Sequence, residues 1–258
     1  MALVSIEMNK HGVARATLNR PDVHNAINDL LIRELTDCVH MLGRHANVRA
    51  IILTGAGKSF SAGADLAYMQ RAADQGEDEN RADAMNIARL FNELSTCPKP
   101  VVALVNGAAL GGGTGIVACC DIAIAHPAAV FGLTEVRLGI IPATISPYVV
   151  AKIGQAQARR YMLTGERFSA DEARRIGLVH EVSDDLEGMA KTIVDALCLG
   201  GPEAIAETKR LIADVADQPV TPDLTAMTAD RIAARRASSE AREGMSAFLD
   251  KRKPGWTE

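Results

Sequence analysis

Glycines cluster at a predicted strand-to-helix junction near the middle of the chain. The apolar run of residues 100–104 is typical of a buried strand, and the run of residues 116–120 is typical of a buried helix. Between these runs lie Gly107, Gly111, Gly112, Gly113 and Gly115. A helix that opens at Gly112 or Gly113 directs free N–H groups and its positive dipole end at whatever lies there.

The backbone at this junction could bind a negatively charged group at close range. Glycine inside a regular element costs roughly 0.5–1 kcal/mol relative to alanine, so a cluster of glycines indicates a constraint. The bound group would be a phosphate, or an oxyanion that forms during a reaction. The alternative is close packing of a helix on small residues, and both interpretations stay open for this stretch alone.

Composition narrows the class of protein. The chain has 258 residues, of which 48% are hydrophobic and 23% charged, as expected for one soluble globular domain or a domain with an appendage. The net charge of −4 argues against general nucleic-acid binding. No apolar run reaches the roughly 18 residues of a membrane span, and we expect no signal peptide. Five cysteines without a C-x-x-C pair argue against zinc and indicate free thiols in the cytoplasm.

Strands alternate with helices in the first two thirds of the chain, which predicts an α/β core with a helical appendage. We expect a hairpin over residues 4–18 and a helix over residues 27–45. Three further strands are expected over residues 48–55, 121–126 and 178–182. The polar stretch 70–83 is predicted to be a mobile loop or a solvated helix end, followed by a helix over residues 84–94. Residues 184–258 should form three or four amphipathic helices.

Two glycine/alanine loops, at residues 61–66 and 107–113, each lie between an apolar strand and a predicted helix. Together with Asn19-Arg20-Pro21 and the segment 243–254, they resemble the enoyl-CoA hydratase/isomerase (crotonase) superfamily, in the right order over nearly the whole chain. The resemblance implies an α/β fold: a crotonase-like spiral of ββα units over residues 1–195. It also implies a C-terminal helical trimerisation region over residues 196–258, which builds a homotrimer or a hexamer made of two trimers.

The resemblance further implies an acyl-CoA substrate, with no cofactor because CoA is part of the substrate, and no metal. In that superfamily two backbone N–H groups bind the thioester oxygen, and by motif position they belong here to Ala64 and Gly112. Two fixed donors in a dry pocket would each stabilise an enolate by roughly 3–4 kcal/mol. The residues implied to bind the substrate and its CoA are Arg20, Ala62, Ala64, Asp65, Leu66, Gly112, Phe248 and Lys251, with Lys253 as a further cation. For each lysine the alternative is a solvated basic end of the chain.

Hydratases of this superfamily use two glutamates to activate a water molecule. The first belongs two residues after the triple glycine, where this chain has Gly115, and the second is present as Glu135. Val136 follows Glu135, and burial in this segment would raise the pKa of Glu135 toward the range of a general acid or base. The alternative role of Glu135 is a structural salt bridge with Arg137.

The single glutamate leaves the reaction open. An isomerase needs only one base, which moves a proton across the double bond. However, residues 135–149 depart from the usual Pro-Gly-x-Gly-Gly segment and resemble the bacterial methylglutaconyl-CoA hydratase branch. The favoured prediction is therefore a hydratase, a lyase of fatty acid or branched amino acid degradation. A non-catalytic acyl-CoA-binding subunit is a further alternative. We expect His126 and His180 to be structural.

Overall fold

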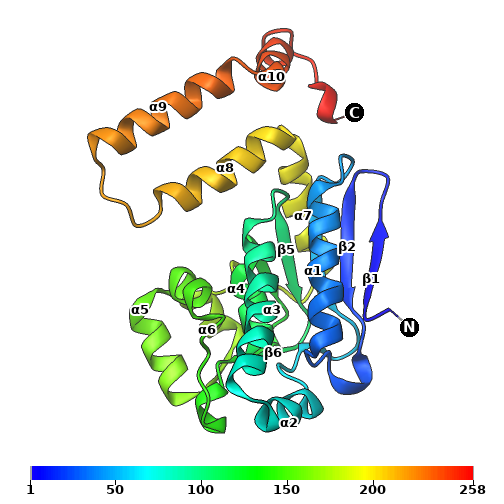
Figure 1. Cartoon of the computed structure of the whole chain (residues 1–258). Helices are drawn as coiled ribbons and strands as arrows, with labels where there is room; N and C mark the ends of the chain where they lie inside the picture. The colour runs from blue at the N-terminus through cyan, green and yellow to red at the C-terminus, as the bar shows by residue number, and fades with distance from the viewer. Residues whose placement is uncertain (1, 258) are drawn as a thin grey trace.

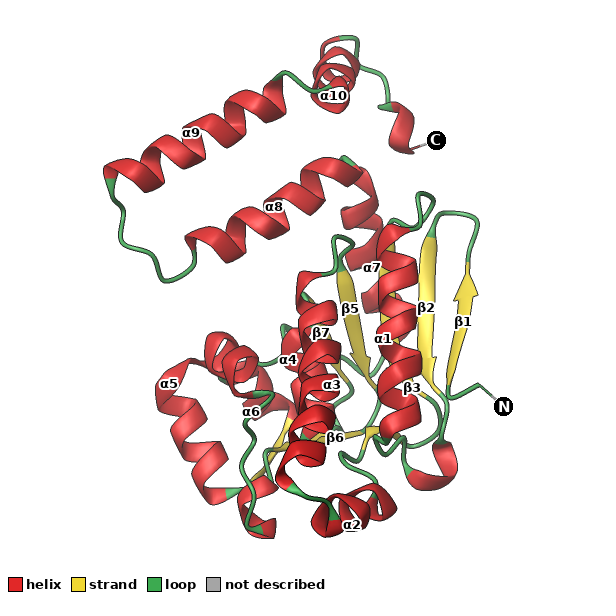
Figure 2. Cartoon of the chain, viewed as in Figure 1, coloured by secondary structure: helices red, strands yellow, loops and turns green. Residues whose placement is uncertain are grey.

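The computed structural model describes residues 2–257 and shows an α/β core from which a helical arm extends (Figure 1). Met1 and Glu258, the outermost residues of the two predicted regions, lie outside the described residues. The core contains two sheets with helices around them, and the arm is wholly helical (Figure 2).

The main sheet consists of six strands. Its order is β1 (Val4–Met8), β2 (Val13–Leu18), β3 (Ala50–Gly55), β5 (Val101–Val105), β7 (Ile122–Ala125) and β10 (Glu181–Val182). The first two strands form the predicted antiparallel hairpin, and every later pairing in this sheet is parallel. Every residue of β3 and of β5 is buried, because helices cover both faces of the sheet. This is why the two strands read as continuous apolar runs.

A smaller sheet of four short strands lies beside the ends of the main one. Its order is β4 (Ser59–Ser61), β6 (Ala108–Leu110), β8 (Val130–Gly132) and β9 (Arg167–Ser169). Each of β3, β5 and β7 is followed by a short strand of this sheet and then by helix, so the chain repeats a ββα unit. The sequence does not predict β4, β6 or β9 individually, because three residues are too few to show a period of two.

Helices pack on both faces of the main sheet. On one face lie α1 (Asp29–Arg44), α3 (Glu77–Thr96) and the short buried helix α4 (Gly112–Cys119). On the other face α7 (Leu186–Leu199) buries Ala190 and Val194 against residues of β3, β5 and β7. The remaining core helices are η1 (Pro21–Val23), α2 (Leu66–Asp74), η2 (Glu135–Leu138), α5 (Ser146–Thr164) and α6 (Ala170–Arg175).

The polar stretch 70–83 is helical rather than a mobile loop, so the second of the two predicted interpretations is confirmed. Only Gln75 and Gly76 separate α2 from α3, and α3 begins seven residues earlier than predicted. Three acidic residues, Glu77, Asp78 and Glu79, occupy the first turn of α3. Their negative charge stabilises the positive end of the helix dipole, so a polar run here marks a helix start.

The arm consists of α8 (Pro202–Val215), α9 (Pro222–Arg236) and α10 (Ser239–Leu249), and ends in η3 (Gly255–Thr257). With α7, these are the predicted C-terminal helices. The helix α7 runs unbroken across the predicted division at residues 195 and 196, and the chain turns into the arm at Gly200–Gly201. The division into two regions stays a prediction.

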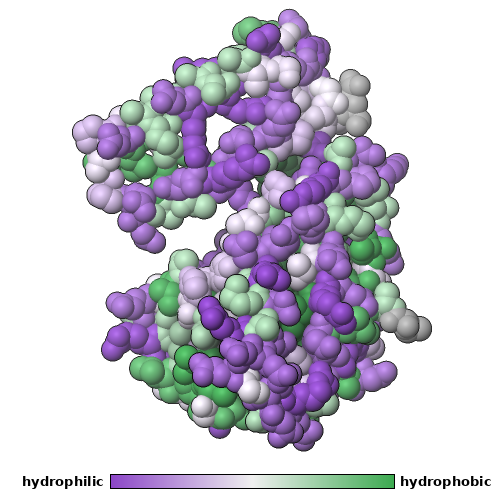
Figure 3. Space-filling view, in the orientation of Figure 1, coloured by the Kyte–Doolittle hydropathy of each residue, from purple (hydrophilic) through white to green (hydrophobic). Residues whose placement is uncertain are grey.

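The arm buries little of its own surface. Neither α8 nor α9 has a buried residue, and large apolar side chains are exposed at Ile212, Val220, Ile232, Met245, Phe248 and Leu249. The space-filling view shows an opening between the arm's helices (Figure 3). A single chain therefore leaves apolar surface on the arm without cover.

Both ends of the arm are attached to the core. The Arg49 guanidinium donates hydrogen bonds to the carbonyl oxygens of Cys198, Gly200 and Trp256, which links the root of the arm to its last turn. On α8, Lys209 forms an ion pair with Asp121 at 2.7 Å.

Within residues 2–257, no helix combines the length and apolarity needed to cross a membrane.

Candidate active site

Two extended segments lie side by side where β4 ends. The Ile27 N–H donates to the Gly63 carbonyl at 2.7 Å, and the Asp65 N–H donates to the Ile27 carbonyl at 2.9 Å, forming a parallel bridge between Ile27 and Ala64. Successive N–H groups of an extended segment point to opposite sides. The Ala64 N–H therefore points away from Ile27, and it has no hydrogen-bond acceptor within residues 2–257.

A second free N–H lies at the start of α4. The helix begins at Gly112, as predicted, so the Gly112 N–H has no partner inside the helix. The part of the chain that the structure describes offers it no other acceptor. The preceding residue, Gly111, has a φ of +50° and donates its N–H to the Gly132 carbonyl at 2.8 Å.

The two loops touch through their backbones. A Cβ atom on Gly63 would lie 2.8 Å from the Leu110 carbonyl oxygen, and one on Gly113 would lie 2.6 Å from the Ser61 carbonyl oxygen. Side chains at these two positions would push the loops apart. Glycine is needed here for close approach, and that approach brings the Ala64 and Gly112 loops together.

Glu135, the first residue of η2, lies against the second loop. A Cβ on Gly111 would be 3.0 Å from Glu135 Oε1. Its other oxygen, Oε2, is buried and has no partner among residues 2–257. Burial raises the pKa of Glu135. Within the same residues Arg137 does not pair with Glu135, since its Nε points at the Thr164 carbonyl, and the salt-bridge alternative is not supported.

Apolar side chains occupy the place of the first glutamate. A Cβ on Gly115 would lie 2.9 Å from Ile145 Cβ, closer still to Ile145 Cγ2, and 3.2 Å from Phe91 Cε1. Ile145 lies thirty positions further along the chain, and sequence spacing does not show that it reaches Gly115. The site therefore has one carboxylate, and apolar side chains fill the space that a second carboxylate would occupy.

Arg20 is held inside the protein. Its guanidinium donates to the Ala26 carbonyl and to Asp65 Oδ2, and the Arg20 and Asp65 side chains are only 17% and 15% exposed. The prediction of a cation free to bind CoA phosphate is therefore not favoured for Arg20. Ala62 lies in the first loop and donates its N–H to the His24 carbonyl at 2.9 Å, whereas the Leu66 side chain is exposed.

The predicted C-terminal ligand contacts lie far from this site within one chain. Phe248 belongs to α10, and Lys251 and Lys253 follow it. The arm's α10 and the helix α2 lie at opposite ends of the molecule (Figure 1). A contact of these side chains with CoA would have to be made in a neighbouring subunit, and it stays a prediction.

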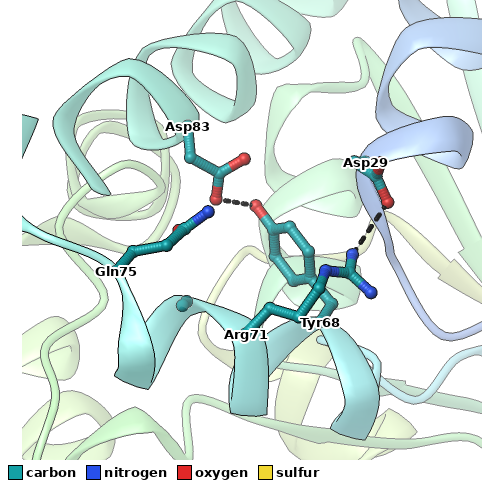
Figure 4. A pocket seen from close by; sticks show the side chains of 6 residues that line it. Asp29, Tyr68, Arg71, Gln75 and Asp83 are labelled. Atoms are coloured by element: carbon teal, nitrogen blue, oxygen red, sulfur yellow. Dashed lines mark hydrogen bonds and ion pairs between the residues drawn. The ribbon is translucent and has the colours of Figure 1, made fainter. Parts of the chain in front are cut away.

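A small pocket between α1, α2 and α3 contains none of the predicted site residues (Figure 4). The Tyr68 hydroxyl donates to Asp83, and Arg71 Nη2 donates to Asp29 Oδ1 at 3.1 Å. These contacts hold α2 against both neighbouring helices. Since α2 begins two residues after Ala64, they also restrict the movement of the first loop.

Sequence reasoning missed Asn25, which is fully buried. Its Nδ2 donates to the Ala56 and Ser59 carbonyls at 2.9 and 2.8 Å, and its own carbonyl accepts from the Ser61 hydroxyl. Its φ is +55°, a conformation that asparagine tolerates better than most residues. The only feature of the sequence that could have indicated this role is the presence of an asparagine in a polar turn.

The two histidines are engaged locally. His180 Nδ1 accepts the Ala123 N–H at 3.1 Å, and burial lowers the pKa of His180. His126 Nδ1 accepts the Ala128 N–H at 3.1 Å. These contacts are those of structural histidines.

Comparison with known proteins identifies the family. The family model described as enoyl-CoA hydratase/isomerase matches residues 8–258. The crystal structure of an enoyl-CoA hydratase from Shewanella pealeana is 42% identical, covers 98% of this chain and 96% of its own, and has a TM-score of 0.96. A short-chain-enoyl-CoA hydratase from Clostridium acetobutylicum is 35% identical over 98% of this chain and 97% of its own. A crotonyl-CoA hydratase from Syntrophomonas wolfei is 36% identical over 92% and 91%.

The chain therefore belongs to the enoyl-CoA hydratase/isomerase family. Its α/β core with a C-terminal helical region is the crotonase fold, as the sequence predicts.

The filled space at Gly115 makes a prediction about stability. Gly→Ala inside a helix ordinarily stabilises by up to about 1 kcal/mol. Here Gly115→Ala should instead lower the free energy of unfolding by roughly 1–3 kcal/mol, because the new methyl group collides with Ile145. In an Ile145→Ala background, which removes the closest methyl group but keeps the Cβ at 2.9 Å, the same change should cost less. Denaturant unfolding of the four proteins measures this, and a stabilising Gly115→Ala in the wild-type background would contradict the packing.

Proposed function

We propose that this protein is a hydratase that adds water across the 2,3-double bond of an enoyl-CoA thioester. The observation that carries the proposal is the contact between two loops whose Ala64 and Gly112 N–H groups have no acceptor within residues 2–257, next to Glu135, whose Oε2 is buried. Donors fixed in this way suit an oxygen that gains charge during the reaction.

In the proposed mechanism the thioester oxygen accepts hydrogen bonds from both N–H groups. Glu135 takes a proton from a water molecule as the water oxygen bonds to C3 of the substrate. The electrons of the double bond move toward the thioester oxygen, which becomes an enolate oxygen. The protonated Glu135 then returns the proton to C2, so the product contains one added water. A raised pKa suits a group that must both take and give a proton.

The isomerase is the second candidate, and the filled space at Gly115 favours it over a two-carboxylate hydration. In that reaction Glu135 would remove a proton from one side of the double bond and return it to the other, with no water added. Product analysis with crotonyl-CoA, a 3-enoyl-CoA and methylglutaconyl-CoA separates the candidates. Tight binding with no turnover on any of them would favour a non-catalytic subunit.

For the substrate we propose a branched or carboxylated acyl group such as methylglutaconyl-CoA. The support is the sequence of residues 135–149, which departs from the usual family segment at the position that contacts Gly115. The proposed reaction needs no cofactor besides the CoA of the substrate. The five free thiols fit a reducing compartment, so we propose that it takes place in the cytoplasm.

The first prediction here concerns the oxyanion donors. Gly112→Val should abolish turnover of crotonyl-CoA, because its side chain would fill the space of the thioester. The fold should survive, since a Cβ at this position meets only the Ile27 Cδ1 methyl, at 3.1 Å. Gly76→Val is the matched control, because a Cβ there meets nothing within 4 Å. Full activity in a folded Gly112→Val protein would refute the assignment.

The second prediction concerns Glu135. Glu135→Gln should reduce kcat by roughly 10²–10⁴-fold with little change in KM, because it removes the base. In the wild type, kcat/KM should fall on the acid side with a midpoint above the pKa of 4.5 of an ordinary glutamate. Because the folded state binds this proton more tightly than the unfolded chain, ionisation costs stability as the pH rises. The variant should therefore be no less stable at neutral pH. Undiminished turnover in Glu135→Gln would exclude this mechanism.

The third prediction concerns assembly. We propose a homotrimer, or a hexamer of two trimers, in which the exposed apolar side chains of the arm contact other subunits. Removal of residues 222–258 should yield monomers in sedimentation velocity experiments. A shorter truncation of residues 248–258 retains α9 and should weaken CoA binding more than assembly. An unchanged oligomer after the longer truncation would argue against contacts through the arm.

A further inference from the structure

The Arg20 side chain bridges the two segments that surround Ala64. One end of its guanidinium donates to the Ala26 carbonyl, and Nη2 donates to Asp65 Oδ2 at 2.9 Å. Ala26 directly precedes Ile27, and Asp65 directly follows Ala64. The guanidinium therefore spans the same two segments that the bridge between Ile27 and Ala64 holds together.

Both ends of this connection are fixed. The backbone of Arg20 is held by Asn25, whose Oδ1 accepts the Arg20 N–H at 2.8 Å and whose N–H donates to the Arg20 carbonyl at 2.9 Å. At the other end, Asp65 Oδ1 accepts the Ala67 N–H at 3.0 Å and caps α2. The direction of the Ala64 N–H is thus determined by a continuous set of hydrogen bonds.

The charges of the pair cancel beside the proposed oxyanion. Burial by itself raises the pKa of Asp65, but the hydrogen bonds from Arg20 and from the backbone of Tyr68 and Ala67 outweigh it, so its pKa is lowered. The pair is therefore ionic at neutral pH. A neutralised arginine adds little net field at the thioester oxygen, so its contribution is to geometry. Enclosing an ion pair to this degree carries a desolvation penalty, which a purely apolar contact would avoid.

We propose that Arg20 and Asp65 are positioning residues that hold the Ala64 N–H in line with the thioester oxygen, an inference that rests on the proposed function. Neither side chain has to touch the substrate for this. Arg20 then differs from the CoA-binding cation that its sequence position implies. Removal of the Arg20 side chain should therefore lower kcat more than it weakens the binding of the CoA substrate.

The kinetic test uses Arg20→Met, Asp65→Asn and Arg20→Lys. Arg20→Met and Asp65→Asn should each lower kcat for crotonyl-CoA about 10²-fold, the effect of a small misplacement, while KM changes less than threefold. Arg20→Lys should recover part of the loss, because an ammonium group can bond to one of the two acceptors. Lys191→Ala is the control, since it removes an exposed ion pair with Asp195 within α7, on the other face of the main sheet, and its kcat should stay within twofold of wild type.

Two kinetic results would overturn the proposal. A large rise in KM with an unchanged kcat would mean that Arg20 binds CoA directly. A lower melting temperature with an unchanged kcat for the folded fraction would mean that the pair only stabilises the fold.

A spectroscopic test separates this inference from the proposed function. Butyryl-CoA labelled with ¹³C at its thioester carbonyl does not react, and isotope-edited infrared spectra report the hydrogen bonds to that carbonyl. In the wild type the bound carbonyl band should shift to lower wavenumber, and Arg20→Met at equal occupancy should lose at least half of the shift. Equal shifts in both proteins, or no shift in the wild type, would overturn the inference. A normal wild-type shift in a protein that turns over no enoyl-CoA would reject the proposed function alone.

Discussion

The site depends on a contact between two backbones that leaves no room for side chains. Gly63 meets the Leu110 carbonyl, and Gly113 meets the Ser61 carbonyl, at distances that exclude a Cβ. Because the loops touch there, the N–H groups of Ala64 and Gly112 belong to one small region, and neither is satisfied within residues 2–257. Ala64 is exposed and Gly112 is partly exposed in a single chain, so a ligand can reach both N–H groups and complete their hydrogen bonds.

The ββα repeat explains how the chain reaches this arrangement. Each of β3, β5 and β7 continues into a short strand of the second sheet, and the loops that follow β4 and β6 then begin helices. The parallel pairing of β4 with β6 places these two loops next to each other. The neighbouring strand β8 ends three residues before Glu135, so the same sheet brings the carboxylate to the second loop. Three consecutive repeats thus supply two donors and one acid.

The apolar filler at Gly115 sets this chain apart from a site with two carboxylates. Ile145 and Phe91 come from the start of α5 and from α3, and together they fill the space above α4. A glutamate at this position would need a gap, and Ile145 and Phe91 occupy the space that its side chain would enter. In the proposed mechanism Glu135 alone transfers the proton, and burial raises its pKa.

Local patterns in the sequence predict much of this structure. The buried strands β3 and β5 show as apolar runs, the start of α4 shows as a glycine cluster, and the hairpin shows as alternation around a polar turn. The three-residue strands do not, because they are too short to carry a period. The role of Arg20 and the filling of Gly115 are also not predictable from spacing. Both depend on contacts between residues that are distant in the chain, Arg20 with Asp65 and Gly115 with Ile145.

The central claim is that a single carboxylate and two backbone donors add water to an enoyl-CoA. Incubation with crotonyl-CoA in D₂O enriched in ¹⁸O, followed by mass spectrometry of the product, tests it most directly. The product should be a 3-hydroxyacyl-CoA that contains one ¹⁸O at C3 and one deuterium at C2. A product that gains deuterium without ¹⁸O, with its double bond moved, would contradict hydration and show that Glu135 only transfers a proton.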